Sequence, residues 1–145
     1  MNQEISVGLS VFVEHGRQQE AADFYAAAFG AQQLRTHGHA GTLMAVDMQL
    51  GALTVSVVGA NPKREANPSQ GGPFFPKAPG AVSTALRLTV PDLDAVVARA
   101  VSAGAMIRNA PGPNDAGRRS AAIYDPFGHL WGLTEREASA DLQAA

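Results

Sequence analysis

The residues with the most direct potential for chemistry are two histidines, His37 and His39, separated by one glycine. Side chains two positions apart on a β-strand point to the same face, so the two imidazoles could bind a metal ion together with Asp47. The alternative is that both histidines are solvated in a glycine-rich loop, the more common setting for such residues. The sequence favours the second interpretation, and it also predicts that His15 and His129, which flank turns, are surface groups.

Arg87 is a further candidate, because it interrupts an apolar stretch between Leu86 and Leu88. Its guanidinium is expected either to bind an anionic or carbonyl-bearing ligand or to be paired internally or exposed at an edge. Arg118 and Arg119 are interpreted as a solvated strand end. The chain contains no cysteine, which excludes thiol nucleophiles, zinc–thiolate sites and redox switching.

The composition describes a globular chain of 145 residues, of which 46% are apolar and 17% charged, with a formal net charge of -2. This length suits one domain that buries roughly two-thirds of its unfolded surface. Lysine and arginine do not cluster, so nucleic acid is not an expected partner. No stretch approaches the ~20 apolar residues of a membrane span, and the first four residues do not resemble a secretion signal. We therefore expect a cytoplasmic protein with no membrane partner.

Apolar periodicity predicts the elements of the first half. Alternation indicates a strand over residues 5–13, and apolar residues at helical spacing indicate a helix of about three turns that ends at Gly30. Two or three more strands are predicted, at residues 33–36, 43–48 and 53–58, with a turn at 49–52. Residues 61–80 contain five prolines and predict an irregular connector, a kind of loop that often covers a binding site. Its adjacent Phe74 and Phe75 could form a lid or pack at a dimer interface.

The same order of elements then repeats. The second half predicts a strand over 86–90, a helix from Asp92 to Gly104, an extended piece from Met106, a turn over 111–117, and strands over 120–124 and 129–134. Val13 and Val90 are 77 residues apart, as are Gly51 and Gly128. Two βαβββ units, each with an apolar face that it cannot bury alone, are therefore expected to share a core and a cleft. The predicted organisation is one α+β domain with module one at 5–60, the connector at 61–80, module two at 82–136 and a frayed helical tail at 137–145.

Three motifs carry a resemblance to a known family: AADFY with FGA within residues 21–31, VPDLDA at 90–95 and DPFGHLW at 125–131. The chain resembles the vicinal oxygen chelate superfamily of glyoxalase I, extradiol dioxygenases, fosfomycin-resistance enzymes and bleomycin-resistance proteins. It is most similar to the bacterial branch described as 3-demethylubiquinone methyltransferase-like. The resemblance implies a curved mixed sheet with a shared cleft, and a homodimer. The motifs also have structural roles, since Phe24, Tyr25 and Phe29 suit helix-to-sheet packing and Asp125 begins a tight turn.

Metal-dependent members of the superfamily hold a divalent cation with one His, Gln or Glu from each of four strands. The resemblance places the four positions at Gly8, Val55, Ala85 and Gly132. None of these side chains has a nitrogen or oxygen donor, so neither a metal nor any other cofactor is expected.

The cleft is expected to be lined by residues in alternation with these positions. They are Ser10, Phe12, Leu53, Val57, Arg87, Thr89, Leu130 and Thr134, with Phe74 and Phe75 from the connector. A mostly apolar lining with a few polar groups is typical of a small-molecule site.

These expectations favour a metal-independent protein that binds an aromatic or antibiotic-like small molecule, with no catalytic residue assigned. The alternative is a lyase or isomerase, which would depend on a metal only if the strand register is misread. No His, Glu or Asp falls on a predicted cleft-facing strand position, so acid and base groups would have to come from loops. A third possibility is a domain whose main role is association with itself or another protein.

Overall fold

The computed structural model describes residues 4–137. They form two compact units, residues 4–26 with 30–75 and residues 27–29 with 76–137. Each unit contains one four-stranded mixed sheet. This agrees with the predicted α+β class and with the predicted repetition of a βαβββ unit. The first three residues and most of the expected tail lie outside the described residues.

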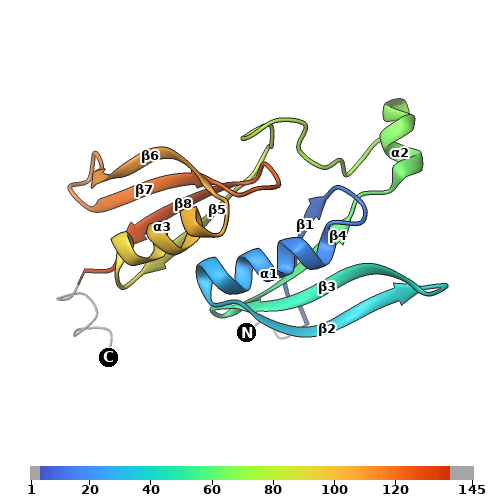
Figure 1. Ribbon diagram of the computed structural model, residues 1–145, viewed down its shortest axis with the longest axis horizontal. Helices are drawn as coiled ribbons and strands as arrows, with labels where there is room; N and C mark the ends of the chain where they lie inside the picture. Colours follow the sequence, from blue (N-terminus) through green and yellow to red (C-terminus); the bar gives the residue numbers. More distant parts are fainter. Residues whose placement is uncertain (1–3, 138–145) are drawn as a thin grey trace. The chain divides into compact units, whose positions relative to one another are not determined.

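The first unit runs from blue to green in Figure 1. Its elements are β1 (Leu9–Val13), all but the last three residues of α1 (Gln18–Phe29), β2 (Gln32–His39), β3 (Thr42–Leu50) and β4 (Leu53–Gly59). The strand order is β1-β4-β3-β2, with β1 parallel to β4 and the other pairs antiparallel. As predicted, α1 ends at Gly30, whose left-handed conformation lets its N–H bond the carbonyl oxygen of Ala26.

The core of the first unit lies between α1 and one face of its sheet. The buried apolar residues of β1, β3 and β4 alternate along each strand, which is the period expected when only one face is covered. They are Val11, Val13, Val46, Met48, Val55 and Val57. Ala21, Phe24 and Tyr25 of α1 are also buried, as expected for the interior face of the helix.

The connector is more ordered than its proline content predicts. It contains α2 (Pro62–Ala66) and the 3-10 turn η1 (Pro68–Gln70). Asn61 caps α2 by accepting a hydrogen bond from the N–H of Lys63 at 2.9 Å, and Pro62 occupies the first turn, where its missing N–H costs nothing. The prediction of an irregular segment throughout is therefore wrong, because a proline at a helix start favours the helix.

The second unit runs from yellow to red in Figure 1. Its elements are β5 (Ala85–Val90), α3 (Leu93–Ser102), β6 (Met106–Pro113), β7 (Arg119–Tyr124) and β8 (Leu130–Glu135). The strand order β5-β8-β7-β6 repeats that of the first sheet, again with one parallel pair, β5 with β8. Asp92 caps α3 by accepting from the N–H of Ala95 at 3.1 Å, as its place before an apolar helix predicts.

The motif DPFGHLW forms the tight turn that precedes β8 and its first two residues. Asp125 is buried, and its Oδ1 accepts hydrogen bonds from the N–H groups of Phe127 and His129, each at 2.9 Å. Its Oδ2 accepts from Trp131 Nε1 at 2.9 Å. His129 is held inside this turn and buried, so the prediction that it is a surface group is wrong. One carboxylate therefore organises both the turn and the buried indole.

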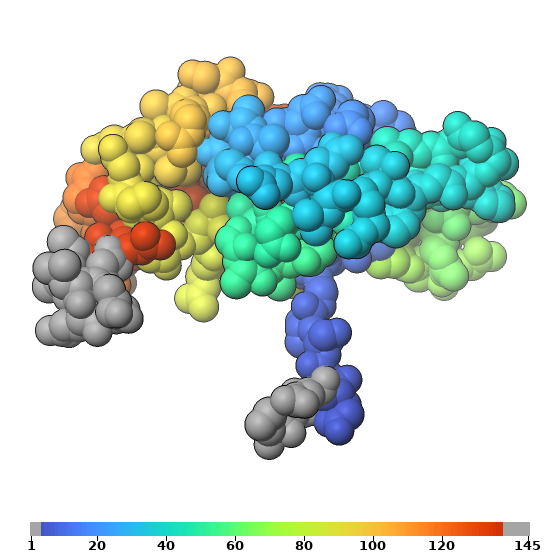
Figure 2. Space-filling view, turned by 90° about the horizontal axis from the view of Figure 1, so that it is seen from below, coloured from blue at the N-terminus to red at the C-terminus, as the bar shows by residue number. Residues whose placement is uncertain are grey.

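The strand predicted over residues 5–13 is shorter than its alternating pattern indicates. Residues 5–8 are not paired, and Ile5 and Val7 are exposed. Figure 2 shows this segment, in dark blue, standing away from the surface. Alternation alone predicts an amphipathic strand but does not supply a neighbouring strand to bond it. No helix within residues 4–137 has both the length and the apolar character needed to cross a membrane.

Candidate functional site

In each unit the helix covers one face of the sheet, and we call the opposite face the open face. On the first open face the strand register brings two rows of residues into line across β2, β3, β4 and β1. The polar row is Arg35, Asp47, Ser56 and Ser10. The apolar row is His37, Ala45, Val58 and Phe12, with the histidine at its edge. Residues opposite one another in a ladder share a face, so these eight side chains belong to one surface.

Asp47 is the centre of the polar row. Its carboxylate receives hydrogen bonds from three side chains: Ser56 Oγ donates to Oδ1, while Arg35 Nη1 and His37 Nε2 each lie 2.8 Å from Oδ2. Asp47 itself is only 6% exposed. The hydrogen bond from Ser56, then that from His37 and less strongly that from Arg35, lower the pKa of Asp47 to about 2 against the opposing effect of burial. Asp47 is therefore a fixed negative charge at any neutral pH.

The cluster corrects two expectations. Asp47 and His37 do lie at strand positions on the open face, so acid and base groups on this surface do not have to come from loops. His37 also belongs to β2 and is paired with Asp47, whereas a solvated loop histidine was favoured. The proposed third member of a metal site, His39, lies opposite Thr42, away from Asp47 in the register. Within residues 4–137 no three His, Asp or Glu side chains come close enough to hold a metal ion.

The second open face carries Ala85, Arg87 and Thr89 of β5, which lie opposite Leu130, Gly132 and Thr134 of β8. Arg87 is exposed, and its side chain forms no ion pair or hydrogen bond with any residue from 4 to 137. A Cβ built on Gly132 would lie 3.7 Å from Arg87 Cγ, so the glycine leaves a flat floor beside the arginine stem. Arg87, Thr89 and Leu130 therefore lie on one surface, and their role in ligand binding stays a prediction.

Leu53 and Val57 do not share the face of Ser10 and Phe12. Ser10 lies opposite Ser56, so the odd-numbered residues of β4 point to the helix-covered face, where Val57 is 0% exposed. The register predicted from the repeat is therefore wrong by one position in β4. The structural equivalent of Gly132 is Ser56 and not Val55, because Ser56 faces Ser10 as Gly132 faces Arg87.

The slip arises at the turns. Two residues join β3 to β4, whereas five residues, 125–129, join β7 to β8. Gly51 is the first residue of its turn and Gly128 the fourth of its own, so residues that follow the two glycines by the same number of positions lie on different faces of their sheets. The corrected set of family metal positions is Gly8, Ser56, Ala85 and Gly132. Three of these side chains have no donor and the fourth is a neutral hydroxyl bonded to Asp47, so this set does not fit a chelated cation.

The aromatic pair of the connector follows η1. Phe74 is 41% exposed and Phe75 is half-buried, and the N–H of Phe75 donates to Glu65 Oε1 at 3.0 Å. This bond ties the segment to α2. A lid role for the two rings stays a prediction.

Arg118 and Arg119 are bonded and not simply solvated. Arg118 Nη2 donates to the carbonyl oxygen of Glu135 at 2.7 Å, and Arg119 Nη2 donates to Asp94 Oδ1 at 2.8 Å. The first bond joins the start of β7 to the end of β8, and the second joins β7 to α3. Both arginines therefore have structural partners in the second unit.

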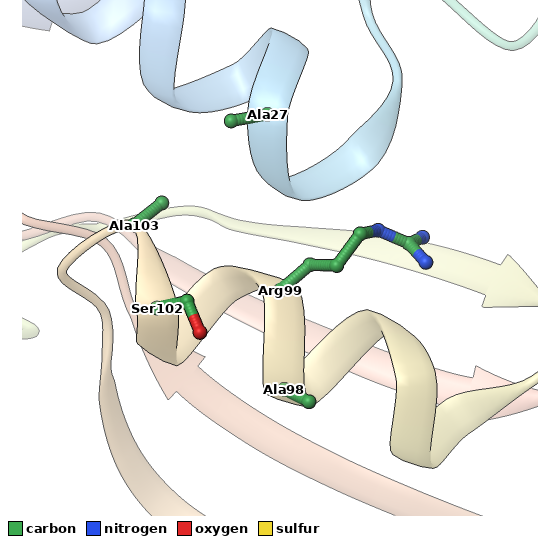
Figure 3. A pocket seen from close by; sticks show the side chains of 5 residues that line it. All are labelled: Ala27, Ala98, Arg99, Ser102 and Ala103. Atoms are coloured by element: carbon green, nitrogen blue, oxygen red, sulfur yellow. The ribbon is translucent and has the colours of Figure 1, made fainter.

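A shallow hollow of about 460 Å³ lies on the helical side of the second unit. Figure 3 shows its lining, made of Ala27, Ala98, Arg99, Ser102 and Ala103. Three of the five side chains are methyl groups, and none of the predicted ligand-binding residues takes part. The hollow offers little chemistry, so the open sheet faces are the better candidates for function.

Comparison with known proteins identifies the family. The Glyoxalase/Bleomycin resistance protein/Dioxygenase superfamily model matches residues 11–133. An uncharacterised protein of Mycobacterium tuberculosis is 35% identical over 129 residues, which cover 86% of this chain and 74% of the relative. A glyoxalase-related enzyme from Fulvimarina pelagi is 18% identical with a TM-score of 0.68, covering 91% of this chain and 89% of its own. Fosfomycin resistance protein FosX from Mesorhizobium loti is 14% identical with a TM-score of 0.62, covering 98% and 99%. These two structures share the fold, and the chain belongs to the glyoxalase/bleomycin resistance protein/dioxygenase superfamily.

Proposed function

We propose that this protein binds a small aromatic or antibiotic-like molecule that carries an anionic or carbonyl group, without a metal ion. The observation that carries the proposal is Arg87, an exposed guanidinium with no partner among residues 4–137, on a strand whose neighbouring positions are small or apolar. A guanidinium that is not used within the chain retains its five N–H donors for a planar anion.

The surroundings of Arg87 support this class of ligand. Gly132 leaves the surface beside it flat, Leu130 offers apolar contact and Thr89 offers a hydroxyl. A few polar groups among apolar ones is the usual make-up of a small-molecule site. Ser10 and Phe12 give the first open face a similar mixture of side chains.

Independence from metal is supported by the side chains at the four family positions, three of which lack donor atoms. The fosfomycin resistance protein among the structural neighbours is a reason to include antibiotics among the ligand candidates. A homodimer, a cytoplasmic location and the narrower 3-demethylubiquinone methyltransferase-like branch are predictions from the sequence that form part of this proposal.

The test is calorimetric titration with 2-naphthoate, a flat aromatic carboxylate, and with its uncharged analogue 2-naphthylmethanol. We expect the carboxylate to bind more tightly, and Arg87→Ala to weaken its binding by about tenfold or more, the scale of one charged hydrogen bond. Arg99→Ala, at an exposed arginine of the helical hollow, is the matched control and should change nothing. Equal weakening by the two substitutions would contradict a specific role for Arg87.

Metal independence has its own measurement. Elemental analysis of the purified protein and thermal melts with Ni²⁺, Zn²⁺ and Mn²⁺ should show neither a stoichiometric metal nor a stabilisation by added cation. A metal present at one equivalent per chain, with a higher melting temperature on its addition, would contradict this part of the proposal.

A further inference from the structure

The Asp47 cluster exposes its two nitrogen-bearing side chains and hides its carboxylate. The side chains of Arg35 and His37 are 59% and 54% exposed, whereas that of Asp47 is 9% exposed. The hydroxyl of Ser56 donates a hydrogen bond to the other carboxylate oxygen, Oδ1. The two exposed groups are therefore held in place by one buried anion, and the free ends of both are accessible from the open face.

The bond to Asp47 decides which nitrogen of His37 carries a hydrogen. An ionised carboxylate only accepts, so Nε2 must be the donor in the 2.8 Å contact with Oδ2. In the neutral ring this leaves Nδ1 as a lone-pair acceptor, and among residues 4–137 it has no hydrogen-bond partner. A buried carboxylate that fixes the tautomer of an exposed imidazole is the arrangement that prepares a histidine to take a proton.

From this geometry we propose that His37 is a general base, oriented by Asp47, for a small enolisable carbonyl compound that carries an anionic group. Arg35 sits beside the same carboxylate and uses Nη1 to bond it, so its other N–H groups can hold the substrate anion. The apolar row next to His37, formed by Ala45, Val58 and Phe12, can accept an apolar or aromatic substituent. A 2-oxo acid with an aryl side chain combines these three features.

The reaction needs no co-reactant. His37 Nδ1 takes a hydrogen from the carbon next to the ketone as a proton, and the C–H electrons form the carbon–carbon double bond of the enolate. The carbonyl π electrons move to oxygen. If the imidazolium gives its proton to that oxygen, the products are the enol and the neutral imidazole, and the net change is a keto–enol isomerisation. In D₂O the imidazolium exchanges its proton with the solvent, so delivery of a deuteron to the enolate carbon instead regenerates the ketone with deuterium in place of hydrogen.

This inference goes beyond ligand binding at Arg87, because it rests on the first open face and assigns a reaction. The probe is phenylpyruvate, and the measurement is loss of its CH₂ signal in D₂O by proton NMR, corrected for exchange in buffer alone. We expect the protein to accelerate exchange. His37→Gln should lower the rate constant kcat roughly 100-fold or more, the scale of a general base. Asp47→Asn should also lower kcat, whereas Arg35→Met should mainly raise KM.

The matched control is His39→Gln, two residues along the same strand, which should leave exchange unchanged. Imidazole added to His37→Ala should restore part of the rate, a result that a purely structural histidine would not give. This rescue also keeps the test valid if the Asp47 variant fails to fold. Wild-type exchange no faster than buffer, His37→Gln as active as wild type, or no rescue would each overturn the proposal. Binding of 2-naphthoate by the His37→Gln variant is measured in parallel, so that loss of the base and loss of the ligand site are told apart.

Discussion

Replacing Asp125 by asparagine should destabilise the second unit, and the structure allows the size of the effect to be worked out. Oδ1 of Asp125 accepts from the N–H groups of Phe127 and His129, and Oδ2 accepts from Trp131 Nε1. In the variant an NH₂ group must replace one of the two oxygens. If it faces Trp131, two donors oppose each other, and if the amide is flipped it opposes two backbone donors instead.

The first orientation is the less costly, since it loses only the hydrogen bond from the indole N–H to Asp125. That loss corresponds to about 2 kcal/mol. Asp125→Ala leaves all three buried donors without this partner, so we expect about twice that cost. For a chain of this size, about 2 kcal/mol corresponds to a fall in melting temperature of roughly 6 °C.

Urea denaturation at neutral pH, followed by tryptophan fluorescence, measures the change through the free energy of unfolding. Asp115→Asn, in the exposed turn after β6, is the control and should stay within about 0.5 kcal/mol of wild type. A cycle with Trp131→Phe, followed by circular dichroism, isolates the indole bond, and we expect Asp125→Asn to cost less in that background. If Asp125→Asn is as stable as the control, or costs the same with and without the indole, the Asp125 carboxylate does not hold the turn and Trp131 as described.

Two further predictions follow from the first unit. Because the pKa of Asp47 falls from 3.8 to about 2 on folding, it stabilises the folded state above pH 3.8, and this contribution is lost as the pH falls through about 2. Urea melts between pH 2 and pH 6 should therefore show a shallower acid loss in Asp47→Asn than in wild type, and parallel profiles would contradict the assignment. Val57→Thr should cost roughly 1–3 kcal/mol because it buries a hydroxyl on the helix-covered face. Val58→Thr on the open face should lower the free energy of unfolding clearly less than Val57→Thr does. A larger loss for Val58→Thr would instead support the register predicted from the sequence.

Local signals in the sequence are sufficient for the order of the eight strands and the two long helices within residues 4–137, but not for the short helical turns of the connector. Gly30 ends α1 through its left-handed conformation, and Asp92 begins α3 through its side-chain bond, both within a few residues of the position they determine. The repeat of βαβββ was likewise visible in apolar periodicity. Each of these features depends on contacts between near neighbours in the chain, which spacing can reveal.

The open face of the first sheet was predicted less well, because register across strands is a long-range property. In β4 the two modules correspond with a shift of 76 residues and not 77. Val57 therefore lies on the helix-covered face and Ser56 on the open face, the reverse of what the repeat predicts. The sequence groups Asp47 only with His37 and His39, whereas the bonds of Asp47 to Arg35 and Ser56 link β2, β3 and β4. A usable signal was present, since Arg35 and His37 are two residues apart on one strand, with a lone acidic residue on the strand that follows.

Stability alone does not account for the Asp47 cluster. A carboxylate that is removed from water must be compensated by good partners, and replacing such a group with apolar side chains is often neutral or stabilising. Its two nitrogen-bearing partners are more than half exposed, so their ion pairs contribute little to the free energy of folding. A sheet face designed only for packing would be expected to carry valine or threonine at these positions. The presence of a buried acceptor that fixes an exposed imidazole and an exposed guanidinium is better explained by a ligand that meets both from the open side.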